Sequence, residues 1–337
     1  MESTNKSLIF HKIYIFVFYT LLHERRIIIR NITKIINSLG TTIVIDINSK
    51  NNQNGILDEI EKMIFDYNDK WSLYNTESLL NRINNSNEYI IVDDDTEDII
   101  NKSILYSNQT NGYFDITTAN LNLLWKDTIK TKKLPDKKEI NKELRNIDYK
   151  KISIKNKKIK IGNNQKIDLG GIAKGYILDK IIDILKEKNI NSGIINLGGT
   201  IHVIGENDIG IRNPFKPINN KINDDYVIKV KLNNESVVTS GIYEQETIID
   251  GISYNHIINP KTGYPCNNNL ISVTLIGDNA CMMDAYATAI FNMNLNDSIK
   301  LLKKENIEGI FIFKNGNIFV TDNLKNKIEM RDANENK

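Results

Sequence analysis

Cysteine is scarce in this 337-residue chain, which contains only two, Cys266 and Cys281. The sequence has no Cys-x-x-Cys pair and no cluster of cysteine with histidine, so we expect no structural zinc site. Spacing alone does not decide whether the two cysteines form a disulfide. With so few cysteines, the sequence also leaves the redox compartment undecided.

An excess of positive charge is missing as well. Lysine and arginine number 44 against 42 acids, which gives a formal net charge of +2. Proteins that bind nucleic acid through a strong overall field are far more basic, so we expect no nucleic-acid partner. Hydrophobic residues make up 40% and charged residues 26% of the chain, which is typical of a soluble globular domain with a substantial core.

The apolar stretch near the N-terminus is too short for an ordinary membrane span. Residues 8–22 read LIFHKIYIFVFYTLL, and a span needs about 20 apolar residues. An uncleaved signal-anchor, an imperfect signal peptide and a helix packed on the protein body stay open, because no A-x-A cleavage pattern follows. We expect residues 1–30 to be a signal or membrane-anchor segment.

Hydrophobic periodicity predicts an α+β fold with mixed sheets and flanking helices. The first third of the chain favours helices, the middle favours short strands, and the absence of regular strand–helix alternation argues against βαβ winding. We expect polar turns and a hairpin over residues 131–166, and a frayed tail from Leu324. Other predicted elements are a strand over 37–47, helices over 55–75, 94–112, 173–188, 279–293 and 296–305, and strands over 193–242 and 270–277.

Two glycine pairs could bring backbone close to a ligand. In IDLGGIAKGYILDK, Asp168, Gly170, Gly171 and Lys174 precede or begin a helix, whose free N–H groups attract anions. A lysine in a first helical turn opposes the helix dipole unless an anion offsets it. Taken alone, however, the stretch favours a plain helix entry with a solvated lysine. The second pair, in NLGGT (196–200), favours a bulge or a close strand crossing.

Further residues carry possible chemistry. In MMDAYATAI, Asp284 and Thr288 are four residues apart, which places a carboxylate and a hydroxyl on one helix face. Both are oxygen ligands that Mg²⁺ accepts, although Asp284 could instead be a helix cap. His256 lies beside a rigid Pro–Gly turn and could present a ring nitrogen to a cleft, or be structural.

Aromatic side chains occur next to two of the predicted helix ends. Tyr113 and Phe114 precede Asp115 in NGYFDITT and could stack on a planar ring system or be buried in the core. Tyr74, in KWSLYNTESLLNRIN, follows a helix and reads as exposed.

Taken together and in order, these stretches resemble the FAD:protein FMN transferases, the ApbE-type flavin transferases. The resemblance covers roughly residues 38–320, and we expect a flavin transferase domain over 38–325. It rests on nine ordered blocks: LGTT, SLYNTESLLNRIN, NGYFDIT, IDLGGIAKGYILDK, INLGGTIHVIG, IGIRNP, VVTSGIYE, YNHIINPKTGYP and SVTLIGDNACMMDAYATAIF.

The resemblance implies an ApbE-like fold and a Mg²⁺-dependent enzyme that transfers FMN from FAD to a threonine or serine hydroxyl and releases AMP. The implied acceptors are flavoprotein subunits of membrane redox complexes. The implied Mg²⁺ ligands are the Asp284 and Thr288 side chains and the Gly171 carbonyl. The favoured general base is His256, with Asp284 second. The implied FAD contacts are Leu39, Tyr74, Tyr113, Phe114, Asp115, Asp168, Lys174 and His256.

The chain departs from the family pattern at several positions. Leu39 stands where methionine is usual, Thr200 and Asn259 each stand where aspartate is usual, and no cysteine is placed to accept a lipid. We expect the protein to be membrane-anchored and extracytoplasmic, with a cytoplasmic location as the alternative. Two rival functions remain: an FAD pyrophosphatase that forms FMN and AMP with water as acceptor, and a flavin-binding protein without turnover.

Overall fold

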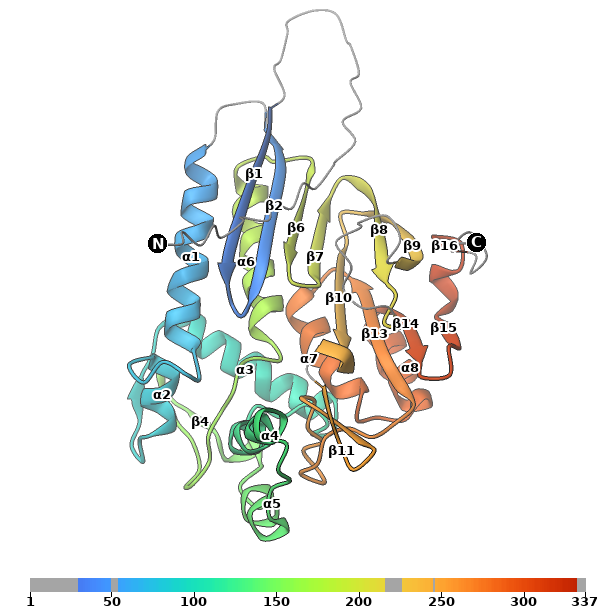
Figure 1. Cartoon of the computed structure of the whole chain (residues 1–337). Coiled ribbons are helices and arrows are strands. Elements are labelled where there is room, and N and C mark those ends of the chain that lie inside the picture. Colours follow the sequence, from blue (N-terminus) through green and yellow to red (C-terminus); the bar gives the residue numbers. More distant parts are fainter. Residues whose placement is uncertain (1–29, 50–53, 216–225, 245, 332–337) are drawn as a thin grey trace, which may run out of the picture.

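The computed structural model describes residues 30–49, 54–215, 226–244 and 246–331. An antiparallel sheet of eight strands, in the order β1-β2-β6-β7-β10-β13-β14-β15, forms the centre of the fold (Figure 1). Helices and smaller sheets surround it, so the predicted α+β class is confirmed. The strands of the central sheet are β1 Arg30–Ser38, β2 Thr41–Ser49, β6 Gly193–Leu197, β7 Thr200–Ile204, β10 Ser236–Gly241, β13 Leu270–Gly277, β14 Glu308–Phe313 and β15 Ile318–Val320.

Three smaller sheets complete the strands of the described residues. The sheet β16-β9-β8 contains Ile328–Met330, Tyr226–Asn233 and Glu206–Arg212. The sheet β3-β5-β4 contains Ile90–Ile91, Lys158–Lys160 and Ser153–Ile154, and the hairpin β11-β12 contains Glu246–Ile249 and Ile252–Asn255.

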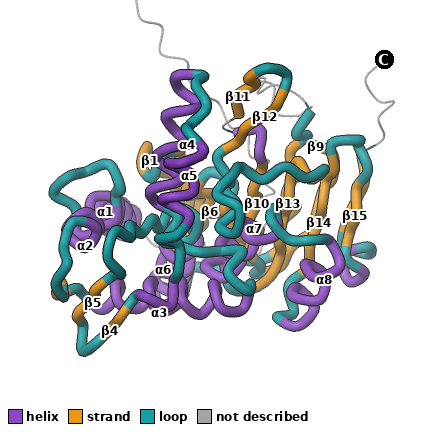
Figure 2. The backbone as a smooth tube through the Cα atoms, turned by 90° about the horizontal axis from the view of Figure 1, so that it is seen from below, coloured by secondary structure: helices purple, strands orange, loops and turns teal. Residues whose placement is uncertain are grey.

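The helices are spread along the described part of the chain, with α1 to α3 in its first third, α4 to α6 in the middle and α7 and α8 in the last. Figure 2 shows α6, α7 and α8 along one face of the central sheet. Their bounds are α1 Asn54–Trp71, α2 Leu79–Asn84, α3 Asp94–Gln109, α4 Ala119–Thr131, α5 Lys137–Leu144, α6 Ala173–Glu187, α7 Ala280–Ile290 and α8 Leu295–Lys304.

The central sheet is covered on both faces, because the side chains that point to each of its faces are apolar. In β14, Phe311 belongs to the core shared with the helices, whereas Ile310 and Ile312 belong to a second core shared with β8 and β9. Successive side chains of a strand point to opposite faces, so two apolar sets require two covering layers. The helices supply one layer and the sheet β16-β9-β8 supplies the other.

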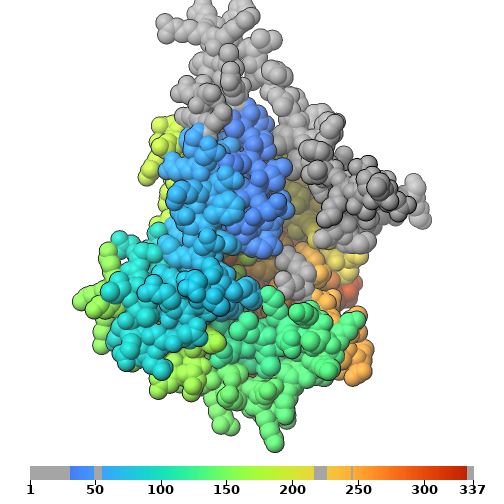
Figure 3. All heavy atoms as spheres, turned by 60° about the vertical axis from the view of Figure 1, so that its left-hand side comes forward, coloured from blue at the N-terminus to red at the C-terminus, as the bar shows by residue number. Residues whose placement is uncertain are grey.

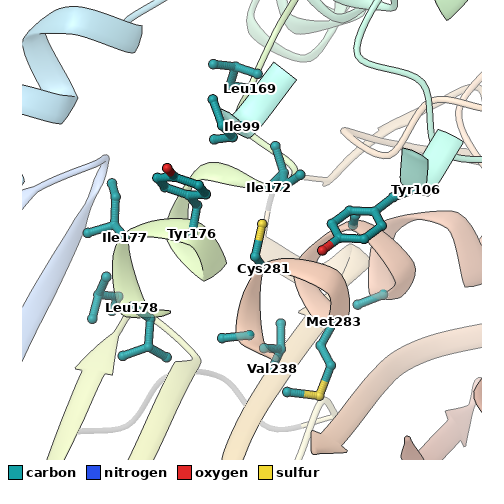
Figure 4. Close-up of a cluster of buried hydrophobic side chains, with 14 of the residues drawn as sticks. Ile99, Tyr106, Leu169, Ile172, Tyr176, Ile177, Leu178, Val238, Cys281 and Met283 are labelled. Carbon is teal, nitrogen blue, oxygen red and sulfur yellow. The ribbon is translucent and has the colours of Figure 1, made fainter. Parts of the chain in front are cut away.

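Helices α6 and α7 pack tightly against each other within the larger core. Ile177, Ile181 and Leu185 recur at helical spacing on α6 and are all fully buried. Figure 4 shows Tyr176 and Ile177 of α6 near Cys281 and Met283 of α7. Both cysteines of the chain are free and buried, which answers the open question of a disulfide.

Three sequence expectations need correction. The strand expected over 37–47 is part of a hairpin, because β1 and β2 are joined by a turn in which Leu39 and Gly40 both have positive φ. The tail expected to fray from Leu324 contains β16, which pairs with β9. The polar stretch after residue 131 contains helix α5 as well as the predicted hairpin.

The predicted N-terminal segment, residues 1–30, lies almost entirely outside the described residues. Within the described residues, none of the helices has the length and apolarity needed to cross a bilayer.

Candidate active site

One large cavity brings together the residues that the sequence predicts for the site. It has a volume of about 1030 Å³ and lies between the central sheet, the N-terminal end of α6 and helix α4. All eleven predicted site residues line it: Leu39, Tyr74, Tyr113, Phe114, Asp115, Asp168, Gly171, Lys174, His256, Asp284 and Thr288.

Asp284 reaches the cavity because α6 and α7 cross at very short range. Gly175 makes the crossing possible: a Cβ on this residue would lie 2.2 Å from the carbonyl oxygen of Ala280. The Gly175 N–H donates to Oδ2 of Asp284 at 2.9 Å, and Asp284 is only 4% exposed. The helix N-cap is Asn279, so Asp284 does not cap its own helix.

Gly171 and Thr288 lie side by side next to Asp284. A Cβ on Gly171 would come within 3.3 Å of Thr288 Oγ1 and 3.4 Å of the Phe114 ring, so glycine keeps this corner open. The Thr288 hydroxyl donates to the carbonyl oxygen of Asp284 at 3.2 Å, within the same helix. The corner therefore combines a carboxylate, a hydroxyl and backbone, which are hard oxygen donors suited to Mg²⁺. The described residues contain no cluster of three or more His, Cys, Asp or Glu with metal-site geometry.

Asp168 holds the loop that leads into α6. Its Oδ1 accepts from the Gly170 N–H at 2.9 Å, and its Oδ2 accepts from Asn122 Nδ2 at 3.0 Å. The Asp168 N–H also donates to the carbonyl of Ile116 at 2.8 Å. The carboxylate thus joins two segments that are far apart in sequence at the cavity wall.

Lys174 occupies the first turn of α6. It is half-buried, lines the cavity, and forms no ion pair with an acid of the described part of the chain. The N-cap residue of α6, Ile172, provides no side-chain hydrogen bond. A lysine beside a positive helix end is unfavourable without a counter-charge, so this end of the cavity favours an anionic ligand.

The turn after α3 places two aromatic rings and a buried acid at the cavity. Asp115 accepts from the N–H and hydroxyl of Thr117 and from the N–H of Tyr149, at 2.8, 2.7 and 3.2 Å. Burial raises the pKa of Asp115, against the effect of these hydrogen bonds. Its carboxylate is therefore engaged in holding the turn, while Tyr113 carries the ammonium of Lys261 over its ring at 3.7 Å.

The His256 loop is fixed on both sides of the histidine. Asn255 Nδ2 donates to the carbonyl of Cys266 at 2.9 Å, and Trp125 Nε1 donates to that of Gly263 at 2.7 Å. His256 is half-buried and lines the cavity between these anchors. A ring nitrogen held by a rigid loop at a cavity wall has the setting that a general base needs.

Asn259 takes the place of the usual aspartate without loosening that loop. Its Oδ1 accepts from the N–H of Lys261 at 2.9 Å, and its backbone carbonyl accepts from Gly263 at 2.8 Å. An amide oxygen closes this turn as a carboxylate oxygen would, because both accept an N–H bond two residues on. Relative to aspartate, Asn259 removes only the negative charge at this position.

The opposite wall is formed by more exposed residues. Leu39 lies in the β1–β2 turn, where its N–H donates to Asn68 Oδ1 at 3.3 Å. Tyr74 lies between α1 and α2 and is 65% exposed. The ammonium of Lys126 sits 3.7 Å from the centre of the Tyr74 ring.

Sequence reasoning missed several residues of the cavity wall, among them Asn122, Lys126, Arg212 and Tyr243. Asn122 and Lys126 are four residues apart on α4, a spacing that could have indicated a shared helix face. Arg212 and Tyr243 come from β8 and from the turn after β10, and the arginine lies over the tyrosine ring at 5.0 Å. No local pattern connects these two.

Comparison with known proteins identifies the family. A sequence model described as the ApbE family matches residues 39–311. The chain belongs to the ApbE family. The match covers all eleven cavity residues named above, from Leu39 to Thr288.

Two curated relatives and one solved structure define the similarity further. A relative from Klebsiella pneumoniae (strain 342), named FAD:protein FMN transferase, is 38% identical over 156 residues, 46% of this chain and 48% of that protein. One of the same name from Treponema pallidum (strain Nichols) is 26% identical over 272 residues, 72% of each chain. The crystal structure of the ApbE protein from Thermotoga maritima matches with a TM-score of 0.81 and 29% identity, over 90% of this chain and 100% of that one.

Proposed function

We propose that this ApbE-family chain is an FAD:protein FMN transferase that moves FMN from FAD to a threonine or serine hydroxyl of an acceptor flavoprotein and releases AMP. One observation carries the proposal. Eleven residues chosen from separate stretches of sequence line a single cavity, and they include an acid, a hydroxyl, a cation, a histidine and three aromatic rings. The names of the relatives point to the same activity.

The cavity suits FAD in size and chemistry. A volume of about 1030 Å³ lies at the upper end for ligand pockets, as a dinucleotide requires. The rings of Tyr74 and Tyr113 offer surfaces on which planar groups stack, whereas Phe114 is only 4% exposed and packs in the core behind the cavity wall. Lys174, beside the N-terminus of α6, provides positive charge for a pyrophosphate.

The corner formed by Gly171, Asp284 and Thr288 fits a magnesium ion. Asp284 keeps one carboxylate oxygen available, because its only hydrogen bond among the described residues is accepted by Oδ2. Mg²⁺ commonly binds through one or two protein oxygens, with waters and substrate phosphate supplying the remainder. Bound here, it would neutralise charge on the pyrophosphate and on the departing AMP.

The chain's own residues would then perform the transfer by positioning and proton removal. The acceptor hydroxyl oxygen forms a bond to the phosphorus of the FMN half, and the bond from that phosphorus to the bridging oxygen breaks. The hydroxyl proton passes to a neutral His256, with Asp284 as the second choice, and AMP leaves with the bridging oxygen. Lys174 would hold the phosphates in line, since phosphoryl transfer depends mainly on placement and charge.

The acceptor and location follow the same proposal. We expect acceptors among flavin-bearing subunits of membrane redox complexes, a catalytic domain over residues 38–325, and an N-terminal segment, residues 1–30, that serves as a signal or anchor. The protein would then act at an extracytoplasmic membrane surface, with the cytoplasm as the alternative.

A single assay tests the function against its rivals. The purified full chain is incubated with FAD, Mg²⁺ and an acceptor domain, followed by in-gel flavin fluorescence and measurement of AMP. Fluorescence on the acceptor with stoichiometric AMP is the expected result. AMP and free FMN without labelled acceptor would replace the proposal with a pyrophosphatase. Bound FAD with neither product would leave a flavin-binding protein.

A further inference from the structure

A lysine-rich projection lies beside the proposed active site. We define the lysine arm as residues 126–142, which contain the second half of α4, the connecting loop and most of α5. This segment holds seven lysines and three acids, whereas the whole chain carries a net charge of only +2. The lysine arm therefore concentrates positive charge, which the rest of the chain offsets only in part.

The charges of the lysine arm are directed to solvent. All seven lysines are exposed, and only Lys142 forms an ion pair, with Glu143 at 3.6 Å, among the residues that the structure describes. Figure 3 shows α4 and α5, in green, as a projection at the lower end of the molecule. Leu134, at the arm's turn, is 48% exposed. A solvated structural helix pair does not need such an excess of one charge, because mixed charges provide solubility and pair along the helix.

The lysine arm continues directly into the wall of the cavity. One face of α4 lines the cavity through Asn122, Lys126 and Ile129. Lys126 is the first lysine of the arm, and its ammonium lies over the exposed ring of Tyr74 at 3.7 Å. A macromolecule that rests on the arm would therefore lie next to the cavity opening.

We propose that the lysine arm is the docking surface for an acidic face of the acceptor protein. This inference rests on the proposed function and deepens it by assigning where the second substrate binds. Complementary charge on two large partners steers their encounter and sets their orientation. The arm would hold the acceptor so that its hydroxyl-bearing segment enters the cavity past Tyr74 and Lys126.

An acidic protein fits the observations better than the other anions do. FAD carries its charge on a pyrophosphate, for which the cavity has Lys174 in the first turn of α6, and Lys126 alone among the arm's lysines lines the cavity. An anionic membrane would need an extended flat face, whereas the arm is a helix pair at one end of the molecule (Figure 1). The acceptor must approach the cavity opening in any transfer reaction, and the arm adjoins it.

Charge reversal at three lysines outside the cavity tests the inference. The variant Lys130→Glu, Lys133→Glu, Lys137→Glu leaves the cavity wall unchanged and alters only exposed side chains. We expect its KM for a purified acceptor domain to rise by about tenfold at low ionic strength, and the difference to shrink in high salt. The affinity for FAD, measured by flavin fluorescence, should stay the same.

A second triple variant provides the control for net charge. Lys158→Glu, Lys188→Glu, Lys314→Glu makes the same change at exposed lysines that have no ion pair among the described residues and lie on other elements. It should alter the KM for the acceptor by less than about twofold. Thermal unfolding of both variants checks that the fold is retained.

The possible outcomes separate the inference from the proposed function. Equal effects of the two variants on the KM would overturn the docking surface. A parallel loss of FAD affinity would also overturn it, in favour of direct contact with FAD. The docking surface would also be overturned if the arm variant lost only its co-sedimentation with phosphatidylserine-containing vesicles and kept its KM for the acceptor. If the wild-type chain binds the acceptor domain in a salt-sensitive, arm-dependent manner but transfers no FMN, the function fails while the docking surface stands.

Discussion

The two walls of the cavity are built in opposite ways. The wall of α6 and α7 is buried, and glycine allows its backbones to approach so closely that Asp284 accepts a hydrogen bond from the neighbouring helix. The wall of α4 and the loop after α1 is exposed and consists of long side chains, with Lys126 resting on Tyr74. The first wall fixes groups in place, and the second presents charge and ring surface to an incoming molecule.

This difference indicates that the buried wall positions groups and that the exposed wall receives an incoming molecule. Groups that act on a phosphorus atom must be held within a fraction of an ångström, which requires close packing and engaged hydrogen bonds. Surfaces that receive a large partner gain more from accessible charge.

Asp284→Asn should damage the buried wall's chemistry without damaging its structure. The amide oxygen can still accept from the Gly175 N–H, so the melting temperature should change little. Loss of the negative charge should lower Mg²⁺-dependent FMN transfer by about 10³-fold. The rate of AMP release in the presence of acceptor measures this. Activity within tenfold of wild type would refute the assignment of Asp284 to the metal.

His256→Gln tests the proposed base. We expect the maximal rate of transfer to fall by about 10²-fold, because glutamine cannot take the acceptor's proton. A maximal rate close to that of the wild-type chain would assign the base to another group.

Gly175→Ala should break the buried wall itself. Alanine favours a helix by about 1 kcal/mol over glycine, but here its Cβ would lie 2.2 Å from the carbonyl oxygen of Ala280. The backbone clash should dominate and lower the free energy of unfolding by about 3 kcal/mol. Urea unfolding provides the measurement. Gly55→Ala, in α1 with no atom within 4 Å of the added Cβ, is the matched control and should cost nothing.

His202 tests the face of the sheet that α6 covers, near Lys186 at the C-terminal end of that helix and outside the cavity wall. It is buried in β7, with Nδ1 2.9 Å from Ser236 Oγ, and burial lowers its pKa to about 4. In the unfolded chain His202 takes up a proton near pH 6.5, whereas in the folded chain it does so only near pH 4. The free energy of unfolding therefore keeps this contribution above pH 6.5 and loses on the order of 3 kcal/mol as the pH falls toward 4. His202→Gln should remove this loss in unfolding experiments at pH 6.5, 5 and 4.

Asp179 contributes with the opposite sign over part of this range. It accepts from the N–H groups of Ala280 and Cys281, and burial raises its pKa to about 6. The folded chain then binds more protons between pH 4 and 6, so this group lowers stability as pH rises. Asp179 is present in both chains, so the difference in pH dependence of unfolding between His202→Gln and wild type reports on the histidine alone. An unchanged pH slope would count against a neutral, buried His202.

Lys126→Met tests the exposed wall and should have the smallest effect. Methionine keeps an apolar stem over Tyr74 but removes the cation, whose interaction with an exposed ring is worth about 0.5–1 kcal/mol. We expect the free energy of unfolding to fall by no more than about 1 kcal/mol, and the affinity for FAD to change by no more than about fivefold. If Lys126→Met lowered the rate of FMN transfer as much as Asp284→Asn, the two walls would not differ as described.

Sequence reasoning worked best where a local pattern and a local structure coincide. The spacing of Asp284 and Thr288 placed both on one helix face, and the glycine pair before Lys174 marked a helix entry beside the cavity. It failed where the outcome depended on pairing between distant segments. The pairing of β16 with β9 is an example, because strand partners leave little local trace in a sequence.

The sequence alone determined the fold class, the resemblance to a flavin-transferase family and the residue types that face the cavity, since periodicity and ordered motifs are local properties of the chain. Only the tertiary structure decided that the Asp115 carboxylate is engaged in holding its turn, that Asn259 still closes the His256 loop, and that α4 adds Asn122 and Lys126 to the wall. The physical reason is the same in each case. Burial, hydrogen-bond partners and shared cavities arise from contacts between segments that are far apart in sequence.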